Sequence, residues 1–392
     1  MDGLAAKGTY GTMRVLTLTP FYPTESDDAA GCFIAEPLRA LENFEIQSSV
    51  VPVRPFYRGR LRAAVDAPRA NWTRYCCLPG GIGLSSAGAF LFARLIAKVR
   101  RLHRAQPIDL IHAHAALPCG HAAALLNRQL QIPFVVTVHG LDAYFTHQVR
   151  GRTGEFCQRI SQSVYRAAAR VICISDKVRS QVLNGALGHL NAEVVYNSAD
   201  PAMFMPGLDS STRPVILSVG NLIPIKAHEL LLRAVAAVRQ EFPDACCEII
   251  GEGPERDRLN GLSRELNIAD KVRFLGRQSR MQVAEAMRRC TLFVLPSRYE
   301  GLGCVYLEAM SAAKPVIACR DQGIAEIIRH RSNGWLIAPG NVAELSDAIS
   351  QLLQDAQLRR EIGSAARQTI LDGLTLNHQA AQLAALYREC VA

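Results

Sequence analysis

The sequence predicts an α/β protein of two domains, each built on a parallel sheet that helices cover. The chain has 392 residues, and a single hydrophobic core stops growing at about 250 to 300 residues, so two domains are expected. Short β-branched runs alternate with segments of helical composition, which is the pattern of parallel strands joined by helices. Hydrophobic residues make up 49% of the chain and charged residues 20%, which excludes a disordered or collagen-like protein.

The first domain is expected to follow a flexible tail, residues 1–12, and to span residues 13–206. Its first strand, residues 14–19, consists mainly of β-branched and apolar residues and ends at Pro20. A helix should follow at residues 32–41. Later strands are predicted at 49–53, 109–113, 134–138 and 171–174, and later helices at 88–103, 119–130 and 156–169.

A segment rich in Pro, Gly, Asp and Ser separates the two domains. We place a linker at residues 207–213 and the second domain at 214–392. Its strands are predicted at 215–219, 246–250, 272–275, 292–295 and 316–318, and its helices at 227–241, 255–266, 281–289, 305–311 and 342–354. The C-terminal helices are expected to pack back on the first domain. Two domains of this kind normally hold a ligand at the carboxyl ends of their strands.

The net charge indicates an anionic partner. The chain carries 44 Lys+Arg and 35 Asp+Glu, a formal charge of +9, and nearly all of the excess lies before Pro206. One stretch contains a single acid, Asp66, among the basic residues Arg54, Arg58, Arg60, Arg62, Arg69, Arg74, Arg94, Lys98, Arg100, Arg101 and Arg104. Because no nucleic-acid-binding signature accompanies this basic block, an anionic membrane surface is the favoured partner and nucleic acid is not expected.

The helix predicted at 88–103 supports this interpretation. Its apolar residues, from Leu91 to Leu102, fall on one side and its basic residues on the other. The ordinary alternative is that the apolar side packs on the sheet and the basic side is only solvated. No segment suits a transmembrane helix, and residues 1–12 lack the apolar run of a secretory signal, so a cytoplasmic protein is expected. The 12 cysteines lack metal-binding spacing and are expected to be reduced thiols.

The strongest local signal runs from Pro296 to Met310, where a predicted strand leads through a glycine loop into a helix. Backbone amides in such a loop, with the free N–H groups of the next helix turn, favour an anion such as phosphate. Glu300 and Glu308 lie on either side of the loop. A second strand end places Lys226 at the start of a helix, where it could neutralise a diphosphate.

Each of these residues also has a structural explanation when it is considered alone. Glu300 could be a favourable charge at a helix N-terminus, Glu308 a solvated helix residue, and Lys226 a surface lysine. The segment at residues 251–255, Gly-Glu-Gly-Pro-Glu, lacks the third glycine of a dinucleotide fingerprint and is weak evidence for NAD.

Taken together, the motifs resemble those of glycosyltransferase family 4. The matching segments, in family order, lie at residues 111–114, 137–142, 195–200, 251–255, 272–276 and 300–308. The resemblance covers residues 13–392 and is greatest to bacterial enzymes that build teichuronic acid, capsule or exopolysaccharide. It implies the GT-B fold, with two Rossmann-like domains whose parallel sheets face each other across a cleft. It also implies a hexosyltransferase that binds a nucleotide-sugar mainly with its second domain and transfers the sugar with retention at the anomeric carbon.

The resemblance further implies roles for individual residues. His139 and Glu300 match the catalytic positions, near the leaving group and at the transferred sugar, and Glu308 matches the carboxylate that binds ribose. The positions that bind the donor diphosphate and sugar are Gly31, Lys226, Gly301, Leu302 and Gly303. A lone histidine after a strand is more often structural, and His112 and His114 keep that interpretation.

The sequence departs from the family pattern in two places. Asn221 stands where the family commonly has arginine, so neutralisation of the diphosphate rests more heavily on Lys226. Residues 322–326, Gln-Gly-Ile-Ala-Glu, replace the common Gly-Gly-x-Pro-Glu segment and leave the donor open. No Asp-x-Asp motif occurs, so we expect no metal and no cofactor.

A UDP-sugar is favoured over GDP-mannose as the donor, and a lipid-linked saccharide of cell-surface polysaccharide biosynthesis as the acceptor. A sugar-nucleotide epimerase, a phosphorylase and a non-catalytic sugar-nucleotide-binding subunit stay open as alternatives.

Overall fold

A computed structural model describes residues 12–58, 70, 72–79, 81, 83–145, 148–186, 188–207 and 213–392. Almost all of the expected tail and linker, together with Arg60, Arg62 and Arg69 of the basic block, therefore lies outside the described residues. The chain forms two compact units. The first comprises Met1–Cys173, Gln181–Val195 and Ala380–Ala392, and the second comprises Ile174–Ser180 and Tyr196–Gln379.

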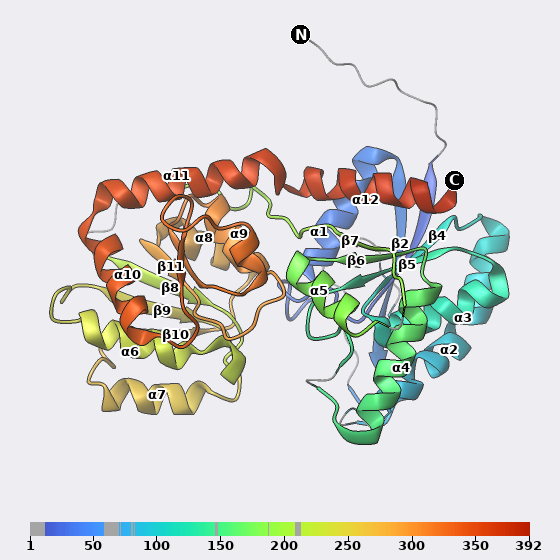
Figure 1. Ribbon diagram of the computed structural model, residues 1–392, viewed down its shortest axis with the longest axis horizontal. Coiled ribbons are helices and arrows are strands. Elements are labelled where there is room, and N and C mark those ends of the chain that lie inside the picture. Colours follow the sequence, from blue (N-terminus) through green and yellow to red (C-terminus); the bar gives the residue numbers. More distant parts are fainter. Residues whose placement is uncertain are drawn as a thin grey trace, which may run out of the picture. The chain divides into compact units, whose positions relative to one another are not determined.

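The first unit is built on a seven-stranded parallel sheet in the order β3-β2-β1-β4-β5-β6-β7. Its central strands β4 and β5 are buried throughout, and they pair in a register that sets His114 beside Thr137. Helices α2, α3 and α4 pack against one another beside this sheet (Figure 1). The strands are β1 (Met13–Thr19), β2 (Ile46–Pro55), β3 (Thr73–Tyr75), β4 (Leu110–His114), β5 (Phe134–Val138), β6 (Arg170–Cys173) and β7 (Ala192–Val194), and the helices are α1 (Cys32–Ala40), α2 (Leu84–Ala105), α3 (His121–Leu130) and α4 (Gly151–Ala167).

The second unit is built on a six-stranded parallel sheet in the order β10-β9-β8-β11-β12-β13. Its core contains Ile216, Ile249, Leu292 and Ile317 from the strands and Leu345 from α10. Helix α6 packs between α7 and α10 (Figure 1). The strands are β8 (Val215–Val219), β9 (Cys246–Ile250), β10 (Val272–Gly276), β11 (Leu292–Val294), β12 (Val316–Cys319) and β13 (Trp335–Ile337), and the helices are α6 (His228–Val238), α7 (Arg256–Glu265), α8 (Arg280–Arg289), α9 (Cys304–Ser311), α10 (Val342–Gln354) and α11 (Ala356–Gly373).

Two helices contribute residues to both units. Helix α5 (Asp176–Asn184) begins in the second unit and ends in the first, and α12 (Leu376–Val391) changes unit after Gln379. In the first unit, Tyr387 of α12 forms a 2.6 Å hydrogen bond with His112 Nδ1. The boundary expected at residue 206 falls within the second unit, because the chain from Tyr196 onwards already belongs there.

The predicted α/β fold is confirmed, and the omissions in the predicted elements have physical causes. Strands β3, β7 and β13, which the sequence did not indicate, are three residues long and too short to show a period of two. Helix α5 was missed because its residues are mainly polar. Helix α2 begins at Leu84, before the predicted residue 88, because Ser85 and Ser86 lower the apparent helical tendency there.

Candidate active site

The glycine loop of the second unit has a backbone path that only glycine permits. It follows β11 and ends at Gly303, which has φ of 84° and precedes the first residue of α9. A Cβ on Gly303 would lie 2.6 Å from the Tyr306 ring. A Cβ on Gly323, from the neighbouring segment, would lie 1.7 Å from the Gly301 carbonyl oxygen. Larger side chains at these positions would displace the loop, so its shape is fixed by close backbone approach.

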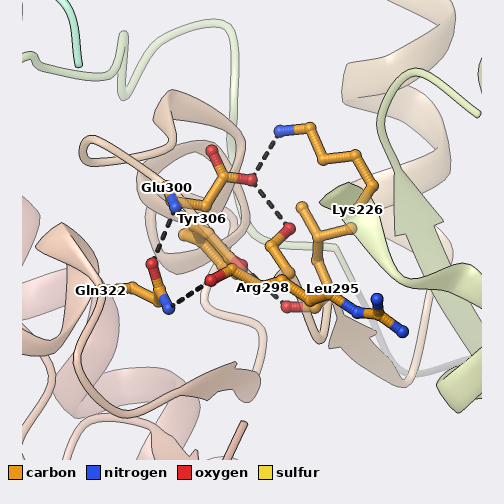
Figure 2. Close-up of polar contacts among 7 residues, drawn as sticks. Lys226, Leu295, Arg298, Glu300, Tyr306 and Gln322 are labelled. Atoms are coloured by element: carbon orange, nitrogen blue, oxygen red, sulfur yellow. Dashed lines mark hydrogen bonds and ion pairs between the residues drawn. The ribbon is translucent and has the colours of Figure 1, made fainter. Parts of the chain in front are cut away.

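Glu300 is held at the start of this loop by several hydrogen bonds (Figure 2). Its Oε1 accepts from Lys226 Nζ at 2.5 Å and from Ser297 Oγ at 2.8 Å. Its backbone N–H donates to Gln322 Oε1 at 2.8 Å, and Gln322 Nε2 donates to the Arg298 carbonyl at 3.0 Å. The carboxylate is buried, so these donors compensate its desolvation. Two predicted site residues, Lys226 and Glu300, are thus in direct contact.

The backbone amides of the loop are not used by the fold itself. In the part of the chain that the structure describes, the N–H groups of Gly301, Leu302 and Gly303 donate no hydrogen bond to a protein acceptor. In the first turn of α9 the Tyr306 N–H donates to the Gly303 carbonyl at 3.0 Å, and the N-terminus of the helix carries a partial positive charge. Loop amides, helix end and the Lys226 ammonium group therefore supply the donors that an anionic phosphate needs.

Lys226 ends a short 3₁₀ helix, Pro224–Lys226, that follows β8. The glycines of the segment at residues 251–255 support this loop from the next strand end. A Cβ on Gly251 would lie 1.9 Å from the Gly220 carbonyl oxygen, and one on Gly253 would lie 2.3 Å from that of Leu222. These glycines permit close packing between two loops, which explains the motif without a dinucleotide.

Glu308 is buried on α9 and forms an ion pair with Arg280, a contact that the sequence did not suggest. Arg280 is itself buried, and its guanidinium lies 4.8 Å from the centre of the Phe204 ring. The structural explanation of Glu308 as a solvated helix residue is therefore wrong. Its partner was missed because the two residues lie on different helices and no local motif joins them.

In the first unit, His139 follows β5 and is fixed from two sides. Its backbone N–H donates to Asp142 Oδ1 at 2.9 Å, and its Nε2 lies 3.1 Å from His114 Nδ1. Burial lowers the pKa of His139 to about 4, so the imidazole is neutral at pH 7. Burial also raises the pKa of Asp142 to about 6, although backbone hydrogen bonds, including that from His139, oppose the shift.

Two aromatic rings connect His139 to the loop that contains Gly31. The Phe33 and Phe21 ring centroids lie 5.1 Å and 5.8 Å from that of His139, both edge to face. Gly31 has φ of 75°, and a Cβ there would lie 2.5 Å from the Tyr22 backbone nitrogen. The first unit thus places the predicted residues His139 and Gly31 on neighbouring loops.

His112 and His114 differ in their surroundings. His112 is fully hydrogen bonded, to Thr137 Oγ1 at 2.7 Å and to Tyr387, as a structural histidine is. Burial, and secondarily His139, lower its pKa to about 3. His114 contacts His139 directly, a relation that adjacent strands in register would have suggested. Among the described residues, no group of His, Cys, Asp and Glu side chains has the arrangement of a metal site.

Comparison with known proteins identifies the family. Residues 33–202 match the family described as Glycosyltransferase Family 4, and residues 204–369 match Glycosyl transferases group 1. An uncharacterized glycosyltransferase of Methanocaldococcus jannaschii is 31% identical over 272 residues, which cover 67% of this chain and 71% of that protein. The chain belongs to glycosyltransferase family 4. It is therefore a glycosyltransferase with the two-domain GT-B fold.

Two further similarities extend over nearly the whole chain. A Bacillus subtilis glycosyltransferase named for teichuronic acid biosynthesis, TuaC, is 25% identical over 386 residues, 91% of this chain and 94% of that protein. The crystal structure of Anabaena HepE in complex with UDP superposes with a TM-score of 0.74 at 20% identity and covers 96% of this chain and 100% of that one. At 20% identity, the similarity to HepE is evidence for a shared fold alone.

Proposed function

We propose that this family 4 glycosyltransferase moves a sugar from a UDP-sugar to a lipid-linked saccharide, with retention at the anomeric carbon, in cell-surface polysaccharide biosynthesis. The observation that carries the proposal is the contact of Lys226 with Glu300, close in the chain to the amides of residues 301–303, which have no acceptor among the described residues. A cation and oriented amides together stabilise the charge that develops on a leaving diphosphate. TuaC, named for teichuronic acid biosynthesis, supports the choice of pathway, and HepE, crystallised with UDP, supports the choice of nucleotide.

In this proposal each site residue has a separate task. Lys226 and the amides of Gly301, Leu302 and Gly303 bind the donor diphosphate and sugar, and Glu308 binds the ribose. Glu300 uses Oε1 for its protein partners, which leaves Oε2 for a sugar hydroxyl. In the first unit, Gly31 allows backbone to approach the donor, and the neutral His139 exchanges a hydrogen bond with a sugar hydroxyl near the leaving group.

A panel of UDP- and GDP-sugars, offered with and without a lipid-linked saccharide, tests the proposal. We expect acceptor-dependent release of nucleoside diphosphate, a product with the donor's anomeric configuration by NMR, and no loss of rate in EDTA. Conversion of the nucleotide-sugar to its epimer would favour the epimerase. Phosphate-dependent cleavage would favour the phosphorylase, and tight binding without turnover a non-catalytic subunit.

We also propose that the enzyme acts at the cytoplasmic face of an anionic membrane. Leu91, Leu95 and Val99 of α2 are buried in the first unit and cannot enter a bilayer, but Arg94 and Arg101 are exposed. Among the described residues, no helix has the length and apolar character that crossing a membrane requires. Attachment would therefore be electrostatic, at about 1 kcal/mol for each basic residue near the surface.

Vesicle sedimentation tests this attachment. We expect binding to vesicles that contain phosphatidylserine, weaker binding at high salt, and none to phosphatidylcholine alone. The variant R94E/R101E should lose binding, whereas R264E/R360E, with the same charge change on exposed arginines of the second unit, should keep more of it. Equal sedimentation of the two variants would refute a role for α2.

A further inference from the structure

Arg280 occupies a position where an arginine is costly. It is the first residue of α8, fixed there by Ser279, whose side chain and backbone exchange hydrogen bonds with Gln282. The N-terminus of a helix carries a partial positive charge that repels a cation. Arg280 is also buried, so its guanidinium loses hydration as well.

Among the described residues, contacts with Glu308 and Phe204 help to compensate these penalties. The guanidinium pairs with Glu308 and lies over Phe204, whose ring is fully buried. A buried ion pair seldom stabilises a fold more than apolar residues of similar size would. The arrangement is therefore better explained by what Arg280 does to Glu308 than by a gain in stability.

The pairing leaves one oxygen of Glu308 for a ligand. Oε1 accepts the hydrogen bond from Arg280, and among the described residues no donor is bonded to Oε2. Glu308 lies five residues beyond Gly303, about 7.5 Å along the helix axis from the end of the glycine loop, whose amides have no acceptor among the described residues. A nucleoside diphosphate whose phosphates bind those amides would bring its ribose towards this carboxylate.

We propose that Arg280 is a positioning residue that orients the Glu308 carboxylate so that Oε2 receives a ribose hydroxyl. Arg280 would thereby set the preference of the site for ribonucleotides over deoxyribonucleotides. The inference rests on the proposed function, because it takes the ligand to be a nucleoside diphosphate, and it adds a residue that acts through Glu308.

Isothermal titration with UDP and its 2′-deoxy analogue, and in parallel with GDP and its 2′-deoxy analogue, tests the inference. The wild-type protein should prefer the better-bound ribonucleotide about 10- to 100-fold, because a hydrogen bond to a charged group is lost in the deoxy analogue. E308Q and R280M should each reduce this preference to about threefold or less. R280K, which keeps the charge but not the planar fork, should restore part of it.

R289M is the matched control. Arg289 ends the same helix and pairs with another buried carboxylate, Glu248, at 2.6 Å. Its loss should lower thermal stability without altering the ribose preference. If R280M also destabilises the protein but keeps the wild-type preference, Arg280 is only structural and the inference is overturned.

The wild-type titrations separate this inference from the proposed function. Wild-type protein that binds neither UDP nor GDP would overturn both. Wild-type binding without ribose preference would overturn the placement of Glu308 and with it the role of Arg280, but would leave the donor class standing.

Discussion

Replacing His228 should make the second unit more resistant to acid. His228 is the first residue of α6, it is 1% exposed, and neither of its ring nitrogens has a hydrogen-bond partner among the described residues. Burial, and secondarily the charge of Lys226, lower its pKa to about 4 from an ordinary value of 6.5. The folded protein therefore excludes a proton that the unfolded chain accepts.

The size of the effect follows from these two pKa values. Stability is fully present above pH 6.5 and falls as the pH drops towards 4, because only the unfolded chain gains the proton in that interval. At 1.36 kcal/mol for each pKa unit, about 2 kcal/mol is lost between pH 7.5 and pH 5. H228L should abolish this part of the loss, and at pH 7.5 it should be close to neutral, because it removes buried polar atoms without partners.

Urea unfolding at pH 7.5 and pH 5 measures the difference. Trp335 is buried in the second unit and Trp72 belongs to the first, so a W72F background lets tryptophan fluorescence report on the second unit alone. Buried histidines of the first unit, such as His112, also reduce stability as the pH falls, because their pKa values are lowered. Asp142, whose pKa is raised, increases stability over the same interval. H378L, at a partly exposed position of the second unit, is the control. Parallel loss of stability in H228L and wild type would refute the reasoning.

Three further predictions concern the site. K226M and E300Q should each slow release of nucleoside diphosphate, with a rise of roughly 1.5 to 3 kcal/mol in the activation free energy. The double variant should show a smaller rise than the sum of the two, because the residues share one contact. Fully additive rises would contradict this. G323A should weaken UDP binding at least about tenfold because its Cβ displaces the loop, whereas G261A, whose Cβ meets nothing within 4 Å, should bind UDP normally in the same titration. H139A should lower turnover, measured as the steady-state rate, far more than it lowers donor affinity. If only the affinity falls, His139 is not a catalytic residue.

The fold was largely readable from the sequence, whereas the contacts within the site were not. Strands such as β11 and β12 are continuous apolar runs because they are buried on both faces, and this signal is strong. The glycine loop was also visible, since Gly301 and Gly303 stand between an apolar run and a helix. These features depend on neighbours in the chain, which a sequence displays directly.

The contacts that orient the site depend on residues far apart in the chain. Arg280 and Glu308 meet across two helices, and His114 meets His139 across two strands. Motifs singled out Glu308 and His139, but no local pattern indicated Arg280 or a site role for His114. Only the packing of the elements shows that Glu308 is buried and paired with Arg280.

The contribution of residues Ala380–Ala392 to the first unit has a consequence for biosynthesis. A ribosome finishes Met1–Cys173 and Gln181–Val195 early, but it must translate all of Tyr196–Gln379 before Tyr387 can reach His112. At about 5 to 20 residues per second, the nascent first unit waits many seconds without its last segment. During that interval the first unit stays incomplete while the ribosome synthesises the second. Synthesis of the first unit thus begins before that of the second unit but ends after it.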